Sequence, residues 1–508
     1  MSKKIVFVAL SVESLAIEYL SSYLKKQGYE VEVVFDPQLF DSEVFHFKKI
    51  SKIFDIKKEL VQQIIEKKPD LIGFSVFTIN YQRCLSIAKE LKKQNKNIPI
   101  IFGGIHPTSV PEVVIKEKNV DLVCVGEGED ALSELLKSIN NKKINTDIKN
   151  IWFKDKNGKI IKNSVRPLIN DLNKLPFLDK DLFNNIYPKF MNDYYTISSR
   201  GCPFRCTYCA NNVLQKVYQG LGKSIRQRSP ENLIEELIVA KKRYSVKHIT
   251  FADDVFVQDL VWLKKFTKLY KRKINLPYTM LTHPSFISQE VANLLAKSGC
   301  FLLAFGIQSA SEKTRTQILN RHETNNQILK AAKHCHQANL KFSIDHIFNI
   351  PSETIKEQEE ALKFYNEIRP SVINSYWLQY FPKTEIIQSA IKYKKIKKED
   401  VVKIENGYAS SSFVVGFGAK DIYNQNLDFA NFQFFFMLLP ILPKSIMNFI
   451  ITKKYYLTSF KPPIFLNILI KFFINLSQKR GYVYLDMIRN IFHFTFQNIF
   501  LKIKFYQK

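Results

Sequence analysis

The sequence of 508 residues predicts an α/β protein with two successive parallel-sheet domains and a mainly helical C-terminal segment. The first observation is an alternation of short apolar runs with amphipathic stretches over residues 1–145. The second is that this alternation resumes over residues 191–400, after a polar connector at 146–190. Continuous apolar strands separated by helices are typical of a parallel sheet that helices cover on both faces. The third is that residues 401–508 lose the alternation and become rich in aromatic residues and lysine.

In the first domain, apolar runs predict strands and amphipathic spacing predicts helices. Strands are expected at 5–10, 30–35, 71–76, 98–102 and 122–125, and helices at 14–27, 60–67 and 81–93. This order indicates a doubly wound sheet, which binds its ligand beyond the carboxyl ends of its strands. The turns expected at that edge contain Ser11, Glu13, Ser75, Phe77, Thr78, Gly103, Gly104, His106, Pro107, Thr108, Gly126, Glu127 and Gly128.

The connector contains one regular stretch. Residues 150–162 alternate in polarity around Lys156-Asn157-Gly158, which predicts a β-hairpin. Pro167, Pro176 and Pro188 then mark an irregular linker.

The second domain repeats a strand and a helix. Strands are expected at 249–252, 278–282, 301–305, 342–348 and 375–380, and helices at 231–244, 260–270, 289–297, 325–337 and 355–368. Repeated βα units of this kind predict a full or partial parallel barrel, whose site lies at the carboxyl ends of the strands. A loop with three cysteines follows the β-rich run 194–198, at that end of the barrel.

The three cysteines are Cys202, Cys206 and Cys209. Cysteine thiolates hold iron-sulfur clusters, and a cubane normally takes four of them. Three leave one iron without a protein ligand, and an open metal position is typical of a catalytic site. The alternative is a structural zinc loop, which uses four Cys or His ligands, usually as separated pairs. The sequence near Cys202 has neither a histidine nor a second cysteine pair.

The pattern Cys-x3-Cys-x2-Cys, with Tyr208 before its last cysteine, resembles the radical S-adenosylmethionine (SAM) superfamily. The resemblance implies that Cys202, Cys206 and Cys209 hold a [4Fe-4S] cluster and that SAM chelates the open iron through its amino and carboxylate groups. An electron from the cluster then cleaves SAM to a 5'-deoxyadenosyl radical. Tyr208 is expected beside the adenine, and no residue is assigned as a general acid or base.

Several later turns resemble elements of the same superfamily. The resemblance implies SAM contacts at Asp253, Asp254, Gly306, Gln308 and Ser309, although Gln308 stands where an acid is usual. For the two carboxylates, a solvated turn is an equal alternative. Residues 347–354 and 381–384 resemble turns in which the usual glycines are replaced, and we expect the first turn to survive because asparagine tolerates unusual backbone angles. Residues 225–231 also match a superfamily segment, and Ser229 with Pro230 is equally a helix start.

His283 and the pair Asp345-His346 fall near the ends of barrel strands. They are interpreted either as cavity residues or as satisfied groups of the barrel rim.

The turns Gly-Gly-x-His-Pro-Thr at 103–108 and Gly-Glu-Gly-Glu at 126–129 resemble the flavodoxin-like cobalamin-binding domain that precedes one large group of radical SAM domains. The Asp-x-His-x-x-Gly signature of other B12 domains is absent. We therefore expect the dimethylbenzimidazole of cobalamin to be off the metal, with no protein imidazole replacing it. His106 is interpreted as a turn histidine in preference to a ligand. A domain that is retained without binding cobalamin is the alternative.

The composition of the chain limits the kinds of partner and substrate that are expected. The formal net charge of +28 indicates an anionic partner, or else a compositional bias of the genome. No nucleic-acid-binding module is recognisable, so the expected substrate is a small or lipid-like molecule. Seven cysteines, of which three share one loop, are typical of a reduced cytoplasmic protein, and the short apolar run 5–10 is not a secretory signal.

The C-terminal segment contains two apolar runs, 432–442 and 464–476, with recurring lysines and few acids. Prolines and lysines interrupt or bound both runs, so neither reaches the length of a membrane span. The favoured interpretation is a helical cap on the barrel. Peripheral contact with the inner face of a membrane is the alternative.

Two cofactors in one chain imply a function. In the resembling group, SAM methylates cob(I)alamin and also supplies the radical, so that a carbon without nucleophilic character can be methylated. The sequence therefore predicts a cobalamin-dependent radical SAM methyltransferase that draws electrons from a flavodoxin or ferredoxin. The alternatives are radical cyclisation or ring rearrangement without methyl transfer, and a membrane-associated iron-sulfur scaffold or sensor. A methylthiotransferase would need further cluster cysteines in the first domain, which Cys84 and Cys124 do not supply.

Overall fold

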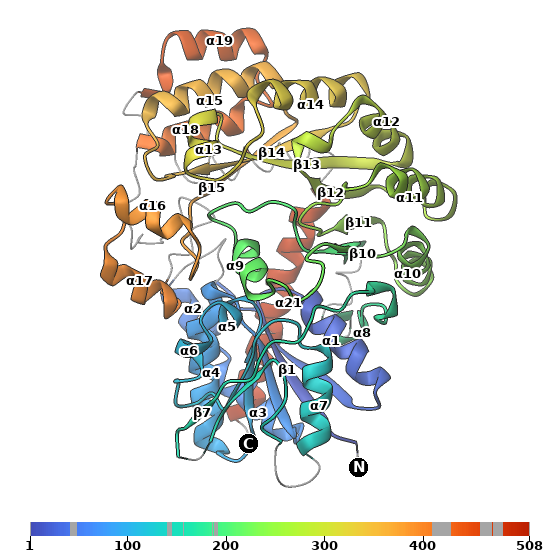
Figure 1. Ribbon diagram of the computed structural model, residues 1–508, viewed down its shortest axis with the longest axis vertical. Helices are drawn as coiled ribbons and strands as arrows, with labels where there is room; N and C mark the ends of the chain where they lie inside the picture. Colours follow the sequence, from blue (N-terminus) through green and yellow to red (C-terminus); the bar gives the residue numbers. More distant parts are fainter. Residues whose placement is uncertain are drawn as a thin grey trace.

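The computed structural model describes residues 2–40, 48–139, 145–155, 157–184, 186, 192–408, 428–457, 470 and 481–506. The N-terminal sheet domain lies at the bottom of Figure 1 and the second sheet domain at the top, with the helix α9 between them. The α/β class and the order of domains agree with the sequence prediction.

The first sheet has seven strands in the order β2-β1-β3-β4-β5-β6-β7. The parallel strands are β1 (Lys4–Leu10), β2 (Glu30–Asp36), β3 (Leu71–Ser75), β4 (Ile100–Gly103) and β5 (Leu122–Cys124). Apolar residues of α1 (Leu15–Lys26) and α7 (Glu129–Ile139) join one core, and those of α3 (Lys57–Glu66) and α4 (Tyr81–Gln94) join the other. Helices therefore cover both faces, as a doubly wound sheet requires.

The predicted hairpin is present as β6 (Ile151–Lys154) and β7 (Ile160–Ile161). It does not stand apart in a linker, because β6 pairs antiparallel with β5 and extends the first sheet. Ile151 and Phe153 point into the core between the sheet and α7, which explains why the strand joins this edge.

The second sheet has six strands in the order β15-β14-β13-β12-β11-β8, all parallel. They are β8 (Asp193–Thr196), β11 (His248–Phe251), β12 (Tyr278–Thr282), β13 (Cys300–Gln308), β14 (Phe342–Phe348) and β15 (Val372–Trp377). The outer helices are α10 (Pro230–Arg243), α11 (Leu260–Lys273), α12 (Gln289–Ser298), α14 (Asn325–Gln337) and α15 (Ile355–Ile368). Because β8 and β15 do not pair, the sheet is a partial barrel.

The last barrel strand begins three residues before its predicted start at 375 and ends three residues before its predicted end at 380. The correction follows from the register, which pairs Val372 with Ser343 and Trp377 with Phe348. Ile373 and Trp377 then reach the helix-covered core, whereas Tyr380 belongs to a separate apolar cluster.

The predicted helical cap is present for part of the C-terminal segment. The helices α18 (Asp428–Leu438) and α19 (Lys444–Thr452) pack on α15, and Phe432, Phe436 and Met447 enter the barrel core. The helix α21 (Gly481–Tyr506) instead lies along the N-terminal domain, where the ring of Phe494 lies 5.5 Å from that of Phe35 (Figure 1). Apart from Ile470, the run 464–476 is outside the described residues.

The length and hydropathy of the helices in the described ranges do not suffice for any of them to cross a membrane.

Three residues, in the two turns that lack their usual glycines, keep the glycine-like backbone. Asn349 has φ +63°, Ser352 has φ +72° and Lys383 has φ +62°. The left-handed region costs an L-residue roughly 1–2 kcal/mol because Cβ crowds the following carbonyl. The turns therefore survive the substitutions, at some cost in stability.

Replacing Ser352 by glycine should stabilise the protein. The change Ser352→Gly removes the Cβ from a left-handed residue, and we expect a gain of up to about 1 kcal/mol after the entropy of the unfolded chain is counted. Thermal unfolding measures the effect. The control Ser138→Gly, inside α7, should lower stability by roughly the same amount, and an equal loss in both variants would contradict the explanation.

Candidate active site

The three cysteines lie in a loop between β9 (Ser199–Arg200) and α9 (Ala210–Val217). This loop follows β8, so it emerges at the carboxyl ends of the barrel strands. Gly201 opens the loop with φ +92°, and a Cβ there would come 2.0 Å from the carbonyl oxygen of Ser224. Only glycine fits at this position, because any other residue would bring its Cβ against that oxygen. The antiparallel pairing of β9 with β10 (Arg226–Gln227) holds the base of the loop.

The three thiols are neighbours. Burial raises the pKa of Cys202 to about 12, and nearby Asp254, Cys206 and Cys209 oppose its ionisation further. Burial likewise raises the pKa of Cys209 to about 11, with Cys206 adding to the effect. Yet within the described ranges no three Cys, His, Asp or Glu side chains converge closely enough to hold one metal ion.

Arg321 contacts one of these thiols and was not singled out from the sequence. Its Nη1 donates to Sγ of Cys206 at 3.7 Å, and its Nη2 donates to the carbonyl oxygen of Gly306 at 2.7 Å. Its Nε donates to Oε1 of Glu323 at 2.7 Å. The guanidinium thus joins the cysteine loop to β13 while placing positive charge beside a sulfur.

Glu323 and His283 support this arginine. Burial alone would raise the pKa of Glu323, but the hydrogen bond from His283 and the charge of Arg321 outweigh it and hold the pKa at about 2. His283 Nε2 lies 3.3 Å from Glu323, and its ring stacks on Phe204 of the cysteine loop at 3.9 Å. His283 is therefore a satisfied rim group.

The adjacent carboxylates after β11 have different surroundings. The buried Asp253 accepts hydrogen bonds from the backbone and side chain of Ser198 and from Oγ of Ser199, at 2.5 to 3.0 Å. It holds the chain that enters the cysteine loop. Asp254 instead borders the cavity described below, where burial raises its pKa and a hydrogen bond with Asn211 opposes the rise.

The other predicted SAM contacts lie around Arg321. Gln308 has φ +67°, and its amide folds back so closely that a Cβ on Gly306 would come 2.2 Å from Nε2. Ser309 is buried and its carbonyl oxygen accepts from Arg315 at 2.6 Å. Tyr208 is half-buried, and loss of solvent around its hydroxyl raises the pKa of that group.

Asp345 and His346 lie on opposite faces of β14. His346 is buried on the helix side, where its ring nitrogens lie 2.8 Å from the Tyr365 hydroxyl and 3.1 Å from Oε1 of Gln358. Burial lowers its pKa to about 3, so it stays neutral. Asp345 accepts from Nδ2 of Asn374 on the inner face at 3.0 Å. The structure therefore leaves Asp345, and not His346, facing the barrel interior.

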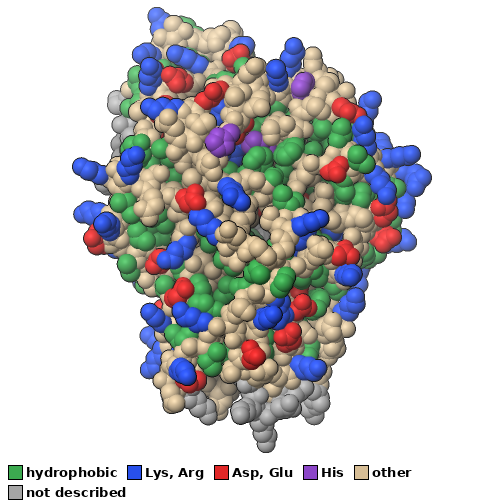
Figure 2. All heavy atoms as spheres, in the orientation of Figure 1, with side chains coloured by type: hydrophobic (Ala, Val, Ile, Leu, Met, Phe, Trp, Pro, Cys, Tyr) green, Lys and Arg blue, Asp and Glu red, His purple; other side chains and the backbone are tan. Residues whose placement is uncertain are grey.

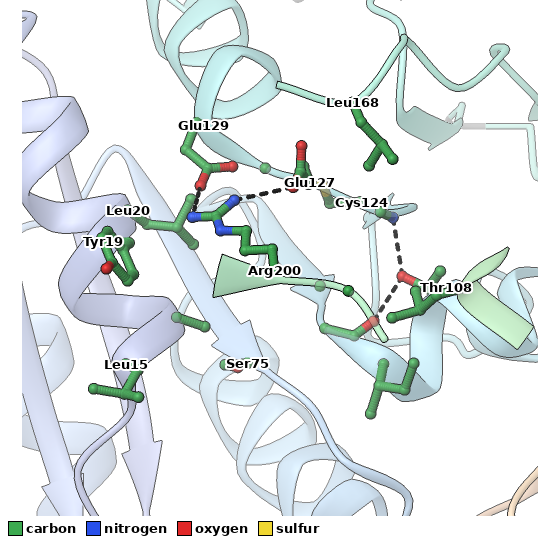
Figure 3. Close-up of a pocket in the computed structure, with 18 of the residues that line it drawn as sticks. Leu15, Tyr19, Leu20, Ser75, Thr108, Cys124, Glu127, Glu129, Leu168 and Arg200 are labelled. Atoms are coloured by element: carbon green, nitrogen blue, oxygen red, sulfur yellow. Dashed lines mark hydrogen bonds and ion pairs between the residues drawn. The ribbon is translucent and has the colours of Figure 1, made fainter. Parts of the chain in front are cut away.

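A cavity of about 430 Å³ lies between the two sheet domains and is lined by both. Figure 3 shows its α1 wall, with Leu15, Tyr19 and Leu20, opposite Leu168 of the connector. Predicted residues on its lining are Ser75, Gly103, Gly104, Thr108, Gly126, Glu127 and Gly128. From the barrel, Cys202, Asn211 and Asp254 also border it. The cysteine loop and the ligand edge of the first sheet thus share one cavity.

Six residues predicted for this ligand edge do not line the cavity: Ser11, Glu13, Phe77, Thr78, His106 and Pro107. His106 turns into the core instead, where Nδ1 lies 3.1 Å from the Thr78 hydroxyl and the ring lies 4.2 Å from that of Tyr81. Burial lowers its pKa to about 4. The α1 wall was missed because its apolar residues are indistinguishable in sequence from ordinary core positions.

Buried ion pairs connect the two walls of the cavity. Arg200, next to the cysteine loop, reaches Glu127 at 3.0 Å and Glu129 at 2.7 Å (Figure 3). Arg226 also reaches Glu127, at 2.8 Å, and the Tyr218 hydroxyl accepts from the Glu127 backbone nitrogen at 2.6 Å. Burial disfavours the Glu127 anion, but the two arginines outweigh burial and lower its pKa.

The loop with three thiols lies at the carboxyl end of a partial barrel and borders a cavity that a doubly wound domain also lines. This arrangement defines the class of radical SAM enzymes in which a cofactor-binding domain precedes the barrel in the chain. Residues 5–136 match the B12 binding domain family, and residues 196–365 match the Radical SAM superfamily. The chain therefore combines a B12 binding domain with a Radical SAM domain that follows it. A [4Fe-4S] cluster, SAM and cobalamin are its cofactors.

Known proteins agree with this assignment. The chain is 28% identical to an uncharacterized methyltransferase of Pyrococcus horikoshii over 70% of this chain and 73% of that protein. It is 25% identical to an anaerobic magnesium-protoporphyrin IX monomethyl ester cyclase of Rubrivivax gelatinosus, over 72% of this chain but 64% of the cyclase. The fold is similar to that of the radical SAM methyltransferase TsrM of Kitasatospora setae, solved with cobalamin and a [4Fe-4S] cluster, with TM-score 0.62, 17% identity, and coverage of 76% and 77%.

Removing the charge of Glu127 should loosen the contact between the domains. In Glu127→Gln, the neutral amide leaves two buried arginines with one acidic partner, and we expect a loss of roughly 2–3 kcal/mol. Hydrogen exchange should rise at 126–129 and 198–202. The matched control is Glu134→Gln on α7, whose partner Arg166 lies 3.1 Å away at an exposed site, where the loss should stay below about 1 kcal/mol. Equal effects would contradict the bridging role.

Removing the charge of Arg321 should lower the reduction potential of the iron-sulfur cluster. In Arg321→Gln, the reduced cluster loses a cation beside Cys206, so the reduction potential should become more negative by roughly 50 mV, or about 1 kcal/mol for one electron. An electron paramagnetic resonance titration measures the potential. Arg243→Gln, at an exposed position on α10, is the control. A potential that is the same in both variants would show that the contact has no electrostatic role.

Proposed function

We propose that this enzyme methylates an unactivated carbon of a small-molecule substrate, using radical chemistry and a cobalamin-borne methyl group. The observation that carries the proposal is the shared cavity. Cys202 and Asp254 of the barrel border the same space as Gly104 and Thr108 of the first domain. A radical initiator and a methyl carrier must both reach one substrate carbon, and a common cavity supports that arrangement.

The residues of the cysteine loop fit an iron-sulfur cluster. Cys202, Cys206 and Cys209 would hold it, with Arg321 balancing negative charge on one thiolate. Tyr208, Asp254, Gly306, Gln308 and Ser309 remain the proposed surroundings of SAM. Asp253 contributes by fixing Ser198 and Ser199 ahead of the loop. When bound, the cluster and SAM supply the 5'-deoxyadenosyl radical, and cobalamin supplies the methyl group.

The cavity residues of the first domain fit a large ligand that needs close backbone approach. Gly103, Gly104, Gly126 and Gly128 line it. Glycine at position 104 is also required by the chain itself, because a Cβ there would come 2.9 Å from the backbone of Val76. Deeper lining residues are apolar and include Phe7, Leu20 and Leu132. We propose that this deep part takes the dimethylbenzimidazole tail. The described lining contains no histidine, which supports binding without a protein imidazole on cobalt.

Asp345 and Asn374 are proposed to face the substrate. Both lie on the inner face of the sheet, and their side chains are 3.0 Å apart. Burial raises the pKa of Asp345, although Asn374 and the charge of Arg321 oppose the rise. A carboxyl group of this kind can accept a hydrogen bond from a substrate hydroxyl or amine and so fix which carbon meets the radical.

Radical cyclisation without methyl transfer is the second candidate, because one relative is named as a cyclase. An iron-sulfur scaffold or sensor would not consume SAM. All of these candidates share the cluster. Consumption of SAM separates the enzyme from a scaffold or sensor, and the fate of the SAM methyl group separates methylation from cyclisation.

Electron supply requires a partner, since radical SAM enzymes need a reductant. We infer an acidic carrier of the flavodoxin or ferredoxin kind. Figure 2 shows lysine and arginine side chains gathered at the periphery of one face, densest along the edge formed by α10 and α11, and this charge would attract such a carrier. All seven cysteines are free, which supports a reducing compartment.

The test uses anaerobic reconstitution with iron, sulfide and cobalamin. Cys206→Ala should lose 5'-deoxyadenosine formation from SAM while keeping the cobalamin spectrum, and Cys335→Ala should keep both. Conversely, Ala16→Trp places an indole from α1 into the cavity and should weaken cobalamin binding at least about tenfold with the cluster intact. Val261→Trp, exposed on α11, is its control.

Transfer of an isotope-labelled methyl group from SAM into a small-molecule extract would identify methylation. Deoxyadenosine formation that persists in Cys206→Ala would refute the radical assignment. Formation of deoxyadenosine without any labelled acceptor would favour cyclisation.

A further inference from the structure

The outward face of α21 is a stripe of large apolar side chains. Phe496 is 69% exposed and Phe500 is 65% exposed, and Phe492, Ile499 and Ile503 are also exposed. Their spacing of four, three, one and three residues places all five within about a third of the helix circumference. The stripe is therefore continuous along three turns.

The opposite face of α21 is fixed to the N-terminal domain. Phe494 is buried in the core that contains β1 and α1, and Asn498 is buried as well. Asn498 Nδ2 donates to the carbonyl oxygen of Phe54 at 3.1 Å, and Lys502 Nζ donates to that of Ile53 at 2.6 Å. The helix cannot rotate to hide its stripe without losing these contacts. A helix that is apolar on all sides is normally covered on all sides.

The helix α2 (Lys48–Phe54) extends the stripe sideways. It contacts α21, and its Ile53 is 65% exposed, with Ile50 also exposed. Lys49 and Lys52 of α2 are exposed at the same place. Across residues 49–55 and 491–503, whose side chains the structure describes, the charged side chains are Lys49, Lys52, Lys502 and Asp55, and Asp55 is paired with Arg83 at 2.7 Å. The surface is thus apolar and flanked by positive charge.

We propose that α2 and the stripe of α21 form a docking surface for an anionic phospholipid bilayer. Aromatic side chains flanked by lysine are typical of helices that lie in the membrane interface. A second copy of the chain fits less well, because a two-fold contact would bring the same lysines together and both copies carry a formal net charge of +28. The contact would be peripheral, and it does not depend on the proposed methyl transfer.

The experiment is flotation of the full-length protein with vesicles of phosphatidylcholine, with or without about one third phosphatidylglycerol. We expect binding to the anionic vesicles only, and weaker binding as salt rises. Phe496→Glu with Phe500→Glu should lower the partition coefficient at least about tenfold. Lys49→Gln with Lys52→Gln should lower it about fivefold for each lysine.

The control is Val261→Glu with Val402→Glu, at exposed valines on α11 (Leu260–Lys273) and α17 (Lys398–Glu405), which should bind as the wild type does. Thermal unfolding of every variant confirms that it is folded. Absence of wild-type binding, or equal binding to neutral vesicles, would overturn the proposal. So would a dimer in light scattering that Phe496→Glu with Phe500→Glu abolishes, because the stripe would then be a contact between copies.

Discussion

The buried ion pairs of Arg200 and Arg226 with Glu127 and Glu129 are the interaction on which the catalytic arrangement depends. Arg200 directly precedes the cysteine loop, Glu127 lies in the turn after β5, and Glu129 begins α7. Each sheet domain has its own core, so neither core fixes the distance between the two cofactor sites. A buried charge is costly without its partner, so these side chains are stable only in the arrangement that pairs them. This requirement fixes how the two domains meet.

A second set of polar contacts acts within the barrel. Arg321 joins the sulfur of Cys206, the carbonyl oxygen of Gly306 and the carboxylate of Glu323, which in turn meets His283. These residues come from the cysteine loop, the end of β12, β13 and the loop after β13. Cys206, a proposed cluster ligand, is thereby tied to the strands that are proposed to border SAM. The same guanidinium places a positive charge beside the sulfur of Cys206.

Outside the site, the C-terminal helices do two different things. The helices α18 and α19 close the barrel core with Phe432, Phe436 and Met447, as an apolar cap should. The helix α21 crosses to the other domain and buries one apolar face there while leaving the other exposed. Composition alone does not distinguish these roles, because all three helices are rich in large apolar residues.

The sequence by itself determined the order of domains, both parallel sheets and the cysteine loop, because period, spacing and glycine placement are local properties. It also indicated the glycine lining of the cavity at Gly104 and Gly126. Only the tertiary structure decided that His106 turns into the core, that Asp253 holds the chain before the loop, and that Glu127 bridges two domains. It alone brought Arg321 to Cys206 and α1 to the cavity wall. These contacts join segments that are far apart in the chain. They depend on the direction and burial of individual side chains, and no local sequence pattern encodes either property.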